Sequence, residues 1–208
     1  MALDTPQYSV EATIGPVEIR RYEPFTMATT AVAGSHQSAG NAGFGILARY
    51  IFGGNSSAAG GGEKIAMTTP VMQVPSGNRF EVRFMMPPGS SVETLPVPTD
   101  HRVTLTDVGA QTLAAVRYRG GWSKELHDRQ LGRLRAALDG AGIPTTGDPI
   151  WARYDPPWKP WFLRHNEVLL TLERSPHLRA TAANCRIRLS RAATRAAVHG
   201  GDQAPVTG

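Results

Sequence analysis

The sequence predicts an α+β fold made of two similar halves, each with the element order strand, helix, strand, strand. Two amphipathic helices are expected at residues 38–52 and 123–139, and β-compatible runs flank both of them. We detect no repeat at the level of individual residues, so the duplication is inferred from the order of elements alone. The strands are expected to form one curved sheet or a distorted barrel, with the two helices packed against it.

The first half begins with two strands and a helix. Residues 15–33 alternate between apolar and polar side chains on either side of the turn Tyr22-Glu23-Pro24. The stretch 38–52 carries apolar residues at the spacing of one helix face, which are Phe44, Leu47, Ala48 and Ile51. The helix is expected to stop at Gly53-Gly54-Asn55, which opens a loop rich in Gly, Ser and Ala.

A hairpin completes the first half. The apolar runs 65–74 and 80–86 are separated by the turn Pro75-Ser76-Gly77-Asn78, which contains residues that favour tight turns. A Pro-rich connection then leads into the second half.

The second half repeats the same order. Strands are expected at 101–107 and 111–119, and a helix at 123–139 whose apolar stripe is His127, Leu131, Leu134 and Leu138. Two further strands, 150–154 and 167–172, flank the loop 155–162, which cannot be a strand because of its prolines.

The distribution of charge divides the chain into two parts. Residues 174–208 carry six arginines and one aspartate, which accounts for the whole net charge of +5. Residues 1–173 are therefore neutral overall and are expected to form the folded domain. Because phosphate binding needs a clustered positive face, we expect no nucleic-acid binding by this domain. The segment 174–208 is expected to be a disordered basic tail able to contact an acidic partner.

The sequence also indicates a compartment. The only cysteine is Cys185, so no intrachain disulfide can form. The first twenty residues lack the basic start and apolar run of a signal peptide, and no apolar stretch reaches the roughly 18 residues of a membrane span. We expect a cytoplasmic protein without a membrane span.

Metal-binding and catalytic signatures are weak. No two of the six histidines have the i, i+4 spacing of a helical metal site, and we expect no metal site. His127 lies on the stripe of the second helix and is the best remaining candidate for an axial ligand, followed by His36. A hydrogen-bonded structural histidine is the more common arrangement. The sequence has neither a G-x-S-x-G motif nor a phosphate-binding glycine loop.

Several motifs together resemble one known family. They are Gly15-Pro16-Val17-Glu18-Ile19-Arg20-Arg21-Tyr22, Arg49-Tyr50-Ile51-Phe52-Gly53-Gly54-Asn55, Lys64-Ile65-Ala66-Met67-Thr68-Thr69-Pro70-Val71, Phe84-Met85-Met86-Pro87, Tyr154-Asp155-Pro156-Pro157 and Arg164-His165-Asn166-Glu167-Val168. In this order, and over residues 8–173, they resemble the SOUL haem-binding family. The resemblance implies a duplicated β-α-β-β fold like that of gyrase-inhibitor-like effector domains. It also implies non-covalent binding of haem or metal-free porphyrin.

The resemblance further implies where the ligand lies. In the family the tetrapyrrole is thought to occupy an apolar groove between the first helix and the loop before the last strand, here 42–51 and 155–164. The implied wall residues are Phe44, Ile46, Leu47, Trp158 and Trp161, and the implied partners of the propionates are Arg49 and Lys159. Some members carry a histidine, a suggested iron ligand, just before the tyrosine of the first motif. This chain has Arg21 there, so that position supplies no ligand.

Three functions remain open at this stage. The leading hypothesis is a non-catalytic cytoplasmic buffer, carrier or sensor of tetrapyrroles. The second is a general module that binds apolar small molecules. The third is an enzyme acting on tetrapyrroles or hydrophobic esters, with Glu167, Glu63, Tyr154 or His165 as the acid or base. A structural hydrogen bond of Glu167 to the preceding loop is the competing interpretation of that residue.

Overall fold

The computed structural model describes residues 6–58 and 60–173. The basic segment 174–208 lies outside the described residues. The strands are β1 (Tyr8–Ile14), β2 (Val17–Tyr22), β3 (Phe25–Ala33), β4 (Asn55–Ser56), β5 (Val71–Ser76), β6 (Arg79–Met85), β7 (Val97–Pro98), β8 (Thr104–Val108), β9 (Gln111–Arg119), β10 (Thr145–Arg153) and β11 (His165–Leu172). The helices are α1 (His36–Ile51), α2 (Lys124–Gly140) and the short 3-10 helix η1 (Trp161–Leu163).

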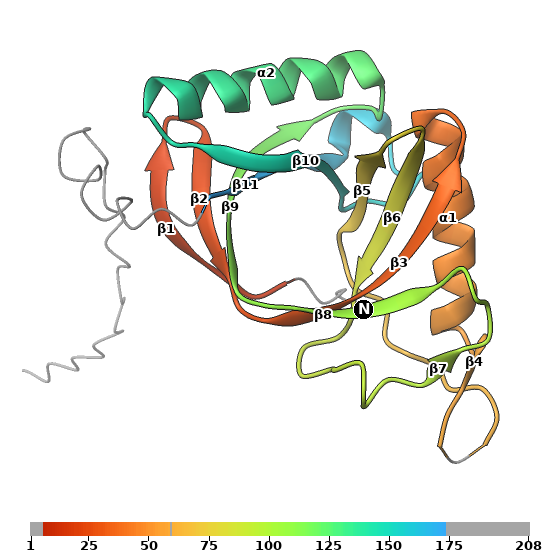
Figure 1. Cartoon of the computed structure of the whole chain (residues 1–208). Helices are drawn as coiled ribbons and strands as arrows, with labels where there is room; N and C mark the ends of the chain where they lie inside the picture. The colour runs from red at the N-terminus through yellow and green to blue at the C-terminus, as the bar shows by residue number, and fades with distance from the viewer. Residues whose placement is uncertain (1–5, 59, 174–208) are drawn as a thin grey trace, which may run out of the picture.

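Nine of the strands form one antiparallel sheet in the order β1-β2-β9-β11-β10-β5-β6-β3-β8. The sheet curves strongly but stays open, with β1 and β8 at its edges (Figure 1). The predicted α+β class is confirmed. Of the two predicted alternatives, the curved sheet is the one observed.

The order of strands is symmetrical about the contact of β10 with β5. On one side lie β5, β6 and β3, and on the other lie β10, β11 and β9. Each group is connected as strand, helix, strand, strand through α1 or α2. The halves also exchange strands, because β2 pairs with β9 and β8 pairs with β3. The duplicated order of elements read from the sequence is therefore present.

Several details differ from the sequence-based expectation: β8 begins at Thr104 rather than at 101, β10 begins at Thr145 rather than at 150, and the two-residue strands β4 and β7 were not predicted. The edge strand β1 was not predicted, although its YSVEATI sequence alternates apolar and polar residues; only β2 pairs with it. The predicted strand 65–74 begins only at Val71. Before it, Ile65 donates its backbone N–H to Ile51 at the end of α1, and Pro70 has no N–H to offer to a ladder.

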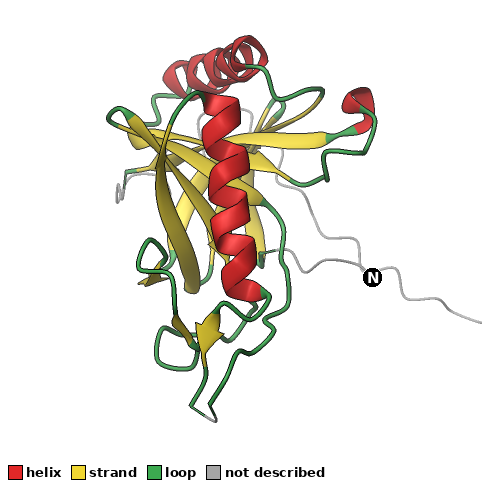
Figure 2. Cartoon of the chain, turned by 90° about the vertical axis from the view of Figure 1, so that its right-hand side faces the viewer, coloured by secondary structure: helices red, strands yellow, loops and turns green. Residues whose placement is uncertain are grey.

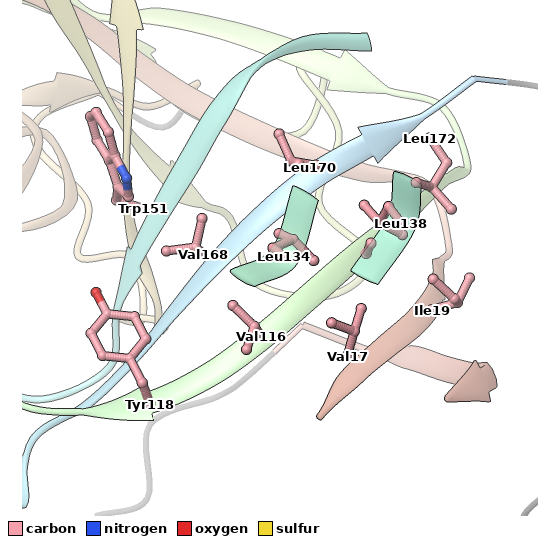
Figure 3. Packing of buried hydrophobic residues seen from close by; sticks show 11 residues of the cluster. Val17, Ile19, Val116, Tyr118, Leu134, Leu138, Trp151, Val168, Leu170 and Leu172 are labelled. Carbon is pink, nitrogen blue, oxygen red and sulfur yellow. The ribbon is translucent and has the colours of Figure 1, made fainter. Parts of the chain in front are cut away.

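The two helices cover the convex face of the sheet (Figures 1 and 2). Helix α1 packs on β3 and β6, and it approaches closely because Gly43 faces Val82, where an added Cβ would lie 2.4 Å from a valine methyl. Helix α2 buries Leu134 and Leu138 against β9 and β11 (Figure 3).

Alternation along the strands separates the two faces of the sheet. In β11, Val168, Leu170 and Leu172 belong to the core beneath α2, whereas Leu169 belongs to a second cluster with Met72 and other residues. The odd-numbered residues of β11, which include Glu167, therefore face the concave side. This alternation puts functional candidates on both faces.

Candidate functional site

Helix α1 contributes only part of the predicted groove. Phe44 is 37% exposed and contacts Phe84, with ring centroids 5.6 Å apart. Arg49 is exposed in the last turn. Ile46 and Leu47 are buried in the core between α1 and the sheet, at 8% and 0% exposure. The surface that α1 offers to a ligand is therefore that of Phe44 and Arg49, and Ile46 and Leu47 hold the helix in place.

The loop between β10 and β11 presents the other predicted residues. Trp158 is 84% exposed and Trp161 63% exposed, and the neighbouring Phe162 is 56% exposed. Trp161 and Phe162 meet edge to face, with centroids 5.7 Å apart. Large aromatic side chains in such a group are unusual on the surface of a protein that has no ligand or partner for them.

Internal hydrogen bonds fix the shape of this loop. Lys159 donates to an Asp155 oxygen at 2.6 Å, and the other oxygen of Asp155 accepts the backbone N–H of His165 at 2.6 Å. Arg164 donates to the carbonyls of Lys159 and Pro157 and stacks on Trp122, with 4.4 Å from its guanidinium carbon to the ring centroid. The exposed aromatic residues thus project from a well-braced platform.

The aromatic loop and Arg49 lie at different heights along α1. Figures 1 and 2 both show η1 level with the N-terminal end of α1, whereas Arg49 lies in the last turn at the opposite end. Arg49 lines a shallow depression of about 420 Å³ together with Tyr50, Gly54 and residues 99–102. The aromatic loop and Lys159 therefore form one group, and Arg49 lies apart from it.

The concave face contains a pocket that sequence reasoning did not identify. It has a volume of about 220 Å³, and both halves of the fold line it. Its walls are mainly apolar and include Tyr22, Phe25, Met27, Met72, Met85, Leu113, Ile150, Tyr154 and Leu169. The only sequence signal was the alternation of these residues along separate strands, which does not reveal that the strands curve around a common space.

A buried ion-pair network lies beside this pocket. Glu167 is 0% exposed and accepts two bonds from Arg20, at 2.7 and 2.9 Å. Arg117 donates to it at 3.0 Å, and the Tyr154 hydroxyl donates at 2.7 Å. Arg20 is also bonded to Glu18 at 2.8 Å and lies 4.4 Å from the Tyr8 ring centroid. The network joins β1, β2, β9 and β11.

This geometry gives Glu167 a structural role. Burial by itself would raise the pKa of Glu167, but its bonds with Arg20, Tyr154 and Arg117 hold the pKa below the usual value. Burial and the neighbouring Glu167 charge raise the pKa of Tyr154. A carboxylate saturated by three donors is a poor general base. The sequence analysis expected Glu167 to bond to the preceding loop; its partners are instead Arg117 on the adjacent strand β9, Arg20 on the next strand β2, and Tyr154.

A pair of histidines meets on the convex face. His36 begins α1 and His127 lies in the first turn of α2, and their ring centroids are 4.8 Å apart. Both rings contact Trp151 of β10, at 4.7 and 5.6 Å. A search for histidines spaced along one helix misses this pair, because its members come from equivalent helices of the two halves.

The histidine pair lacks the acidic ligands that would complete a metal site. Within residues 6–58 and 60–173, no group of three or more His, Cys, Asp and Glu side chains is arranged to hold a metal ion. Burial, followed by the charge of Arg153, lowers the pKa of His36 to about 4. Burial, His36 and Arg153 together lower the pKa of His127 to about 3. Both rings are therefore neutral at pH 7.

Comparison with known proteins identifies the family. Residues 3–171 match the model of the SOUL heme-binding proteins. The chain belongs to the SOUL heme-binding protein family. Heme-binding protein 1 of Sus scrofa is 28% identical over 126 residues, which cover 59% of this chain and 65% of that protein. The match thus spans slightly less than two thirds of this relative.

Solved structures of low sequence identity share the fold. The C-terminal domain of EcmrR has a TM-score of 0.57 at 11% identity, covering 81% of this chain and 99% of that domain. A Listeria innocua protein described as a hydrolase has a TM-score of 0.54 at 13% identity, covering 78% and 94%. At these identities the likeness concerns the fold alone. Among the residues described, no helix is long and apolar enough to cross a membrane.

Proposed function

We propose that this SOUL-family protein binds haem or a related tetrapyrrole non-covalently, with the aromatic loop between β10 and β11 as the principal contact. The observation that carries the proposal is the group of exposed rings at Trp158, Trp161 and Phe162 on a loop braced by hydrogen bonds. A porphyrin is flat and apolar on its faces, so covering these rings removes apolar area from water on both partners. We include Phe44 of α1, which is 37% exposed, as a further apolar contact of the proposed ligand.

Cations are available for the propionates of such a ligand. Lys159 lies among the exposed rings and forms an ion pair with Asp155. Arg49 is exposed at the far end of α1 and is within reach only of a ligand that lies along the helix. A charge-assisted contact contributes about 1.5 to 3 kcal/mol when it is desolvated, so Lys159 is the more important of the two.

Iron contributes little to this mode of binding. Arg21 is exposed on β2 where some family members place a histidine, and both His36 and His127 are directed into the interior. We therefore propose that binding relies on the porphyrin faces and carboxylates, which suits a cytoplasmic buffer, carrier or sensor. The buried, ion-paired state of Glu167 favours a non-catalytic role over a hydrolytic one.

Absorbance titration of the full chain with haem and with iron-free protoporphyrin tests the proposal. Replacing both Trp158 and Trp161 by Ser is expected to weaken binding of both ligands by about ten- to a hundredfold, because two stacking surfaces are lost. Phe52→Ser is the matched control, since Phe52 is 60% exposed at the other end of α1. Equal losses in the two variants, or none in the double variant, would remove the aromatic loop from the site.

Charge reversal tests the propionate contacts separately. Lys159→Glu is expected to weaken binding by about 1 to 3 kcal/mol, or roughly one to two decades, with little effect on stability. Arg49→Glu is expected to give the smaller loss because of its distance from the aromatic loop. Unchanged titration curves for both variants would contradict the assignment of these two residues.

The concave pocket supports a second candidate function, the binding of a general apolar small molecule. Its three methionines, Met27, Met72 and Met85, provide adaptable walls suited to ligands of varied shape. Met27→Trp would fill part of this volume without touching the aromatic loop. If that variant abolishes porphyrin binding while the double tryptophan variant retains it, the pocket is the binding site.

A further inference from the structure

The N-terminal ends of α1 and α2 converge on a group of buried polar side chains on the convex face. His36 and His127 meet there, with Trp151 and Arg153 of β10 beneath them and Tyr118 of β9 beside them. Trp151 and Arg153 lie two residues apart on one strand and so face the same side of the sheet. Figure 3 shows Trp151 and Tyr118 on adjoining parts of this face, with the Tyr118 hydroxyl directed toward Trp151.

The polar atoms of this group are mostly donors without an acceptor. The following atoms are buried and have no hydrogen-bond partner within the described residues: His36 Nδ1, both nitrogens of His127, the Tyr118 hydroxyl, Trp151 Nε1 and Arg153 Nε. His127, Tyr118, Trp151 and Arg153 are each at least nine-tenths buried. An unpaired buried donor costs about 1 to 3 kcal/mol, so several together indicate a common acceptor.

The charge of the group is positive and uncompensated. Arg153 is 8% exposed, and its guanidinium bonds are to neutral partners: Gln73 Oε1 at 2.8 Å and His36 Nε2 at 3.1 Å. Burial lowers the pKa of Arg153 to about 10, which still leaves it charged at pH 7. Among the described residues, no carboxylate forms an ion pair with it.

The surrounding elements add to the positive field. The first turns of both helices contribute partial positive charge beside the group, because His36 and His127 belong to these turns. One carboxylate, that of Asp128, favours the protonated form of both histidines, but it is exposed and paired with Lys124 at 2.6 Å. A cation is therefore disfavoured here, and an acceptor of negative charge is favoured.

We propose that this group is a binding site for a small monovalent anion, a halide or a carboxylate, held by Arg153, Trp151 and Tyr118 beneath the two helix N-termini. Because Arg153 Nη2 donates to His36 Nε2, the His36 proton lies on Nδ1, and this N–H is a further donor to the anion. The site is interior and the aromatic loop is exposed, and Trp122 lies between them, with its ring centroid 4.9 Å from the guanidinium carbon of Arg153 and 4.4 Å from that of Arg164.

Binding of the anion and of protons should reinforce each other. The charged and titratable groups that face the site are Arg153, the two histidines, Tyr118 and the Asp128–Lys124 pair. A bound anion favours the protonated form of either histidine, so anion affinity should rise as the pH falls. At pH 5 the anion should therefore stabilise the fold more than it does at pH 8.

Thermal unfolding of the full chain in sodium chloride, bromide, acetate or gluconate at one ionic strength tests the proposal. Gluconate is the reference, because this carboxylate is too large for an interior site that holds a halide or acetate. Chloride and bromide are expected to raise the Tm above its value in gluconate by about 2 to 4 °C, with a larger difference at pH 5. An equal rise in Tm with acetate would show that the site also accepts carboxylates. A rise in Tm with chloride and bromide alone would show that the site accepts only spherical anions. Equal Tm values in all four salts would overturn the proposal.

Variants and a direct measurement locate the effect. Arg153→Met is expected to abolish the halide response, whereas Arg83→Met should retain it, because Arg83 is a partly buried residue of the opposite, concave face and is paired with Glu81. If Arg153→Met does not fold, Tyr118→Phe and Trp151→Phe each remove one donor and should reduce the response. In crystals soaked in bromide, an anomalous peak near Trp151 Nε1 and Arg153 Nε would establish the site. No peak, with an unchanged response in Tyr118→Phe and Trp151→Phe, would refute it.

Discussion

Two buried arginines occupy opposite faces of the same sheet and are satisfied in different ways. Arg20 faces the concave side and is held by Glu167 in a two-point ion pair. Arg153 faces the helices and is bonded only to neutral groups. The two groups are close in the sheet. Ala152, the residue before Arg153, pairs with Glu167, which is the partner of Arg20.

The difference distinguishes a structural group from a binding group. The Arg20 network is closed, since each buried charge in it has an opposite partner within the chain. Such a network fixes the register of β2, β9 and β11 and leaves nothing for a ligand. The Arg153 group is open, with donors that no other described residue satisfies. A closed network therefore indicates structure, and an open one indicates a binding site.

The largest expected effect is the loss of the closed ion pair. Glu167→Gln leaves Arg20 buried without its main counter-charge and should lower the free energy of unfolding by about 3 to 5 kcal/mol. Urea unfolding at pH 7 measures this change. Glu18→Gln is the control, because Glu18 lies at the exposed rim of the same network, and its loss should cost about 1 kcal/mol or less. Similar losses in both variants would contradict the closed-network interpretation.

Acid sensitivity of the open group is the next largest effect. His36 and His127 have a pKa of about 4 and about 3 in the folded protein, below the unfolded value of 6.5, so the unfolded chain binds more protons below pH 6.5. Stability should fall as the pH decreases from 6.5 to 4, by about 2 to 3 kcal/mol for His127. His127→Phe should flatten the profile of unfolding free energy against pH in this window. His101→Gln, a change at an exposed turn, should leave the profile unchanged.

Chloride should reduce that acid sensitivity if the open group binds an anion. At pH 5, the difference in Tm between wild type and His127→Phe should narrow when chloride replaces gluconate, because the anion offsets the added positive charge. The expected narrowing is about 1 to 2 °C, smaller than the effect of either change alone. If the Tm difference between wild type and His127→Phe is the same in both salts, the acid sensitivity does not depend on anion binding.

Local patterns in the sequence predicted most of the elements but neither arginine group. The helix periodicity around Leu47 and Leu134 and the turn residues between strands gave both helices and most strands. The Arg20–Glu167 contact joins residues 147 positions apart, and no local pattern encodes such a contact. The motif that contains Glu167 was visible, and only the fold shows that its partner lies in the first motif.

The sequence indicated which residue types form the candidate site, but it did not indicate which of those side chains are exposed. Trp158 and Trp161 are exposed on one proline-rich loop, and Lys159 lies half-buried between them. The family resemblance implied Ile46 and Leu47 as wall residues of a groove along 42–51, but the face of α1 that they occupy packs on the sheet. Sequence periodicity shows that a helix has an apolar face, and it does not show what covers that face.

The smallest expected effect comes from removing the basic segment, and it sharpens the contrast between the two arginines. Residues 174–208 include one carboxylate side chain, Asp202, and truncation tests whether this segment supplies a counter-charge for Arg153. Truncation after Glu173 should change the unfolding free energy by no more than about 0.5 kcal/mol and should leave the chloride response intact, because the anion is proposed to come from solution. Urea unfolding of both chains in chloride and in gluconate measures the two quantities. A truncated chain that unfolds much more easily, or that responds more strongly to chloride than the full chain, would mean that the segment itself supplies the missing acceptor.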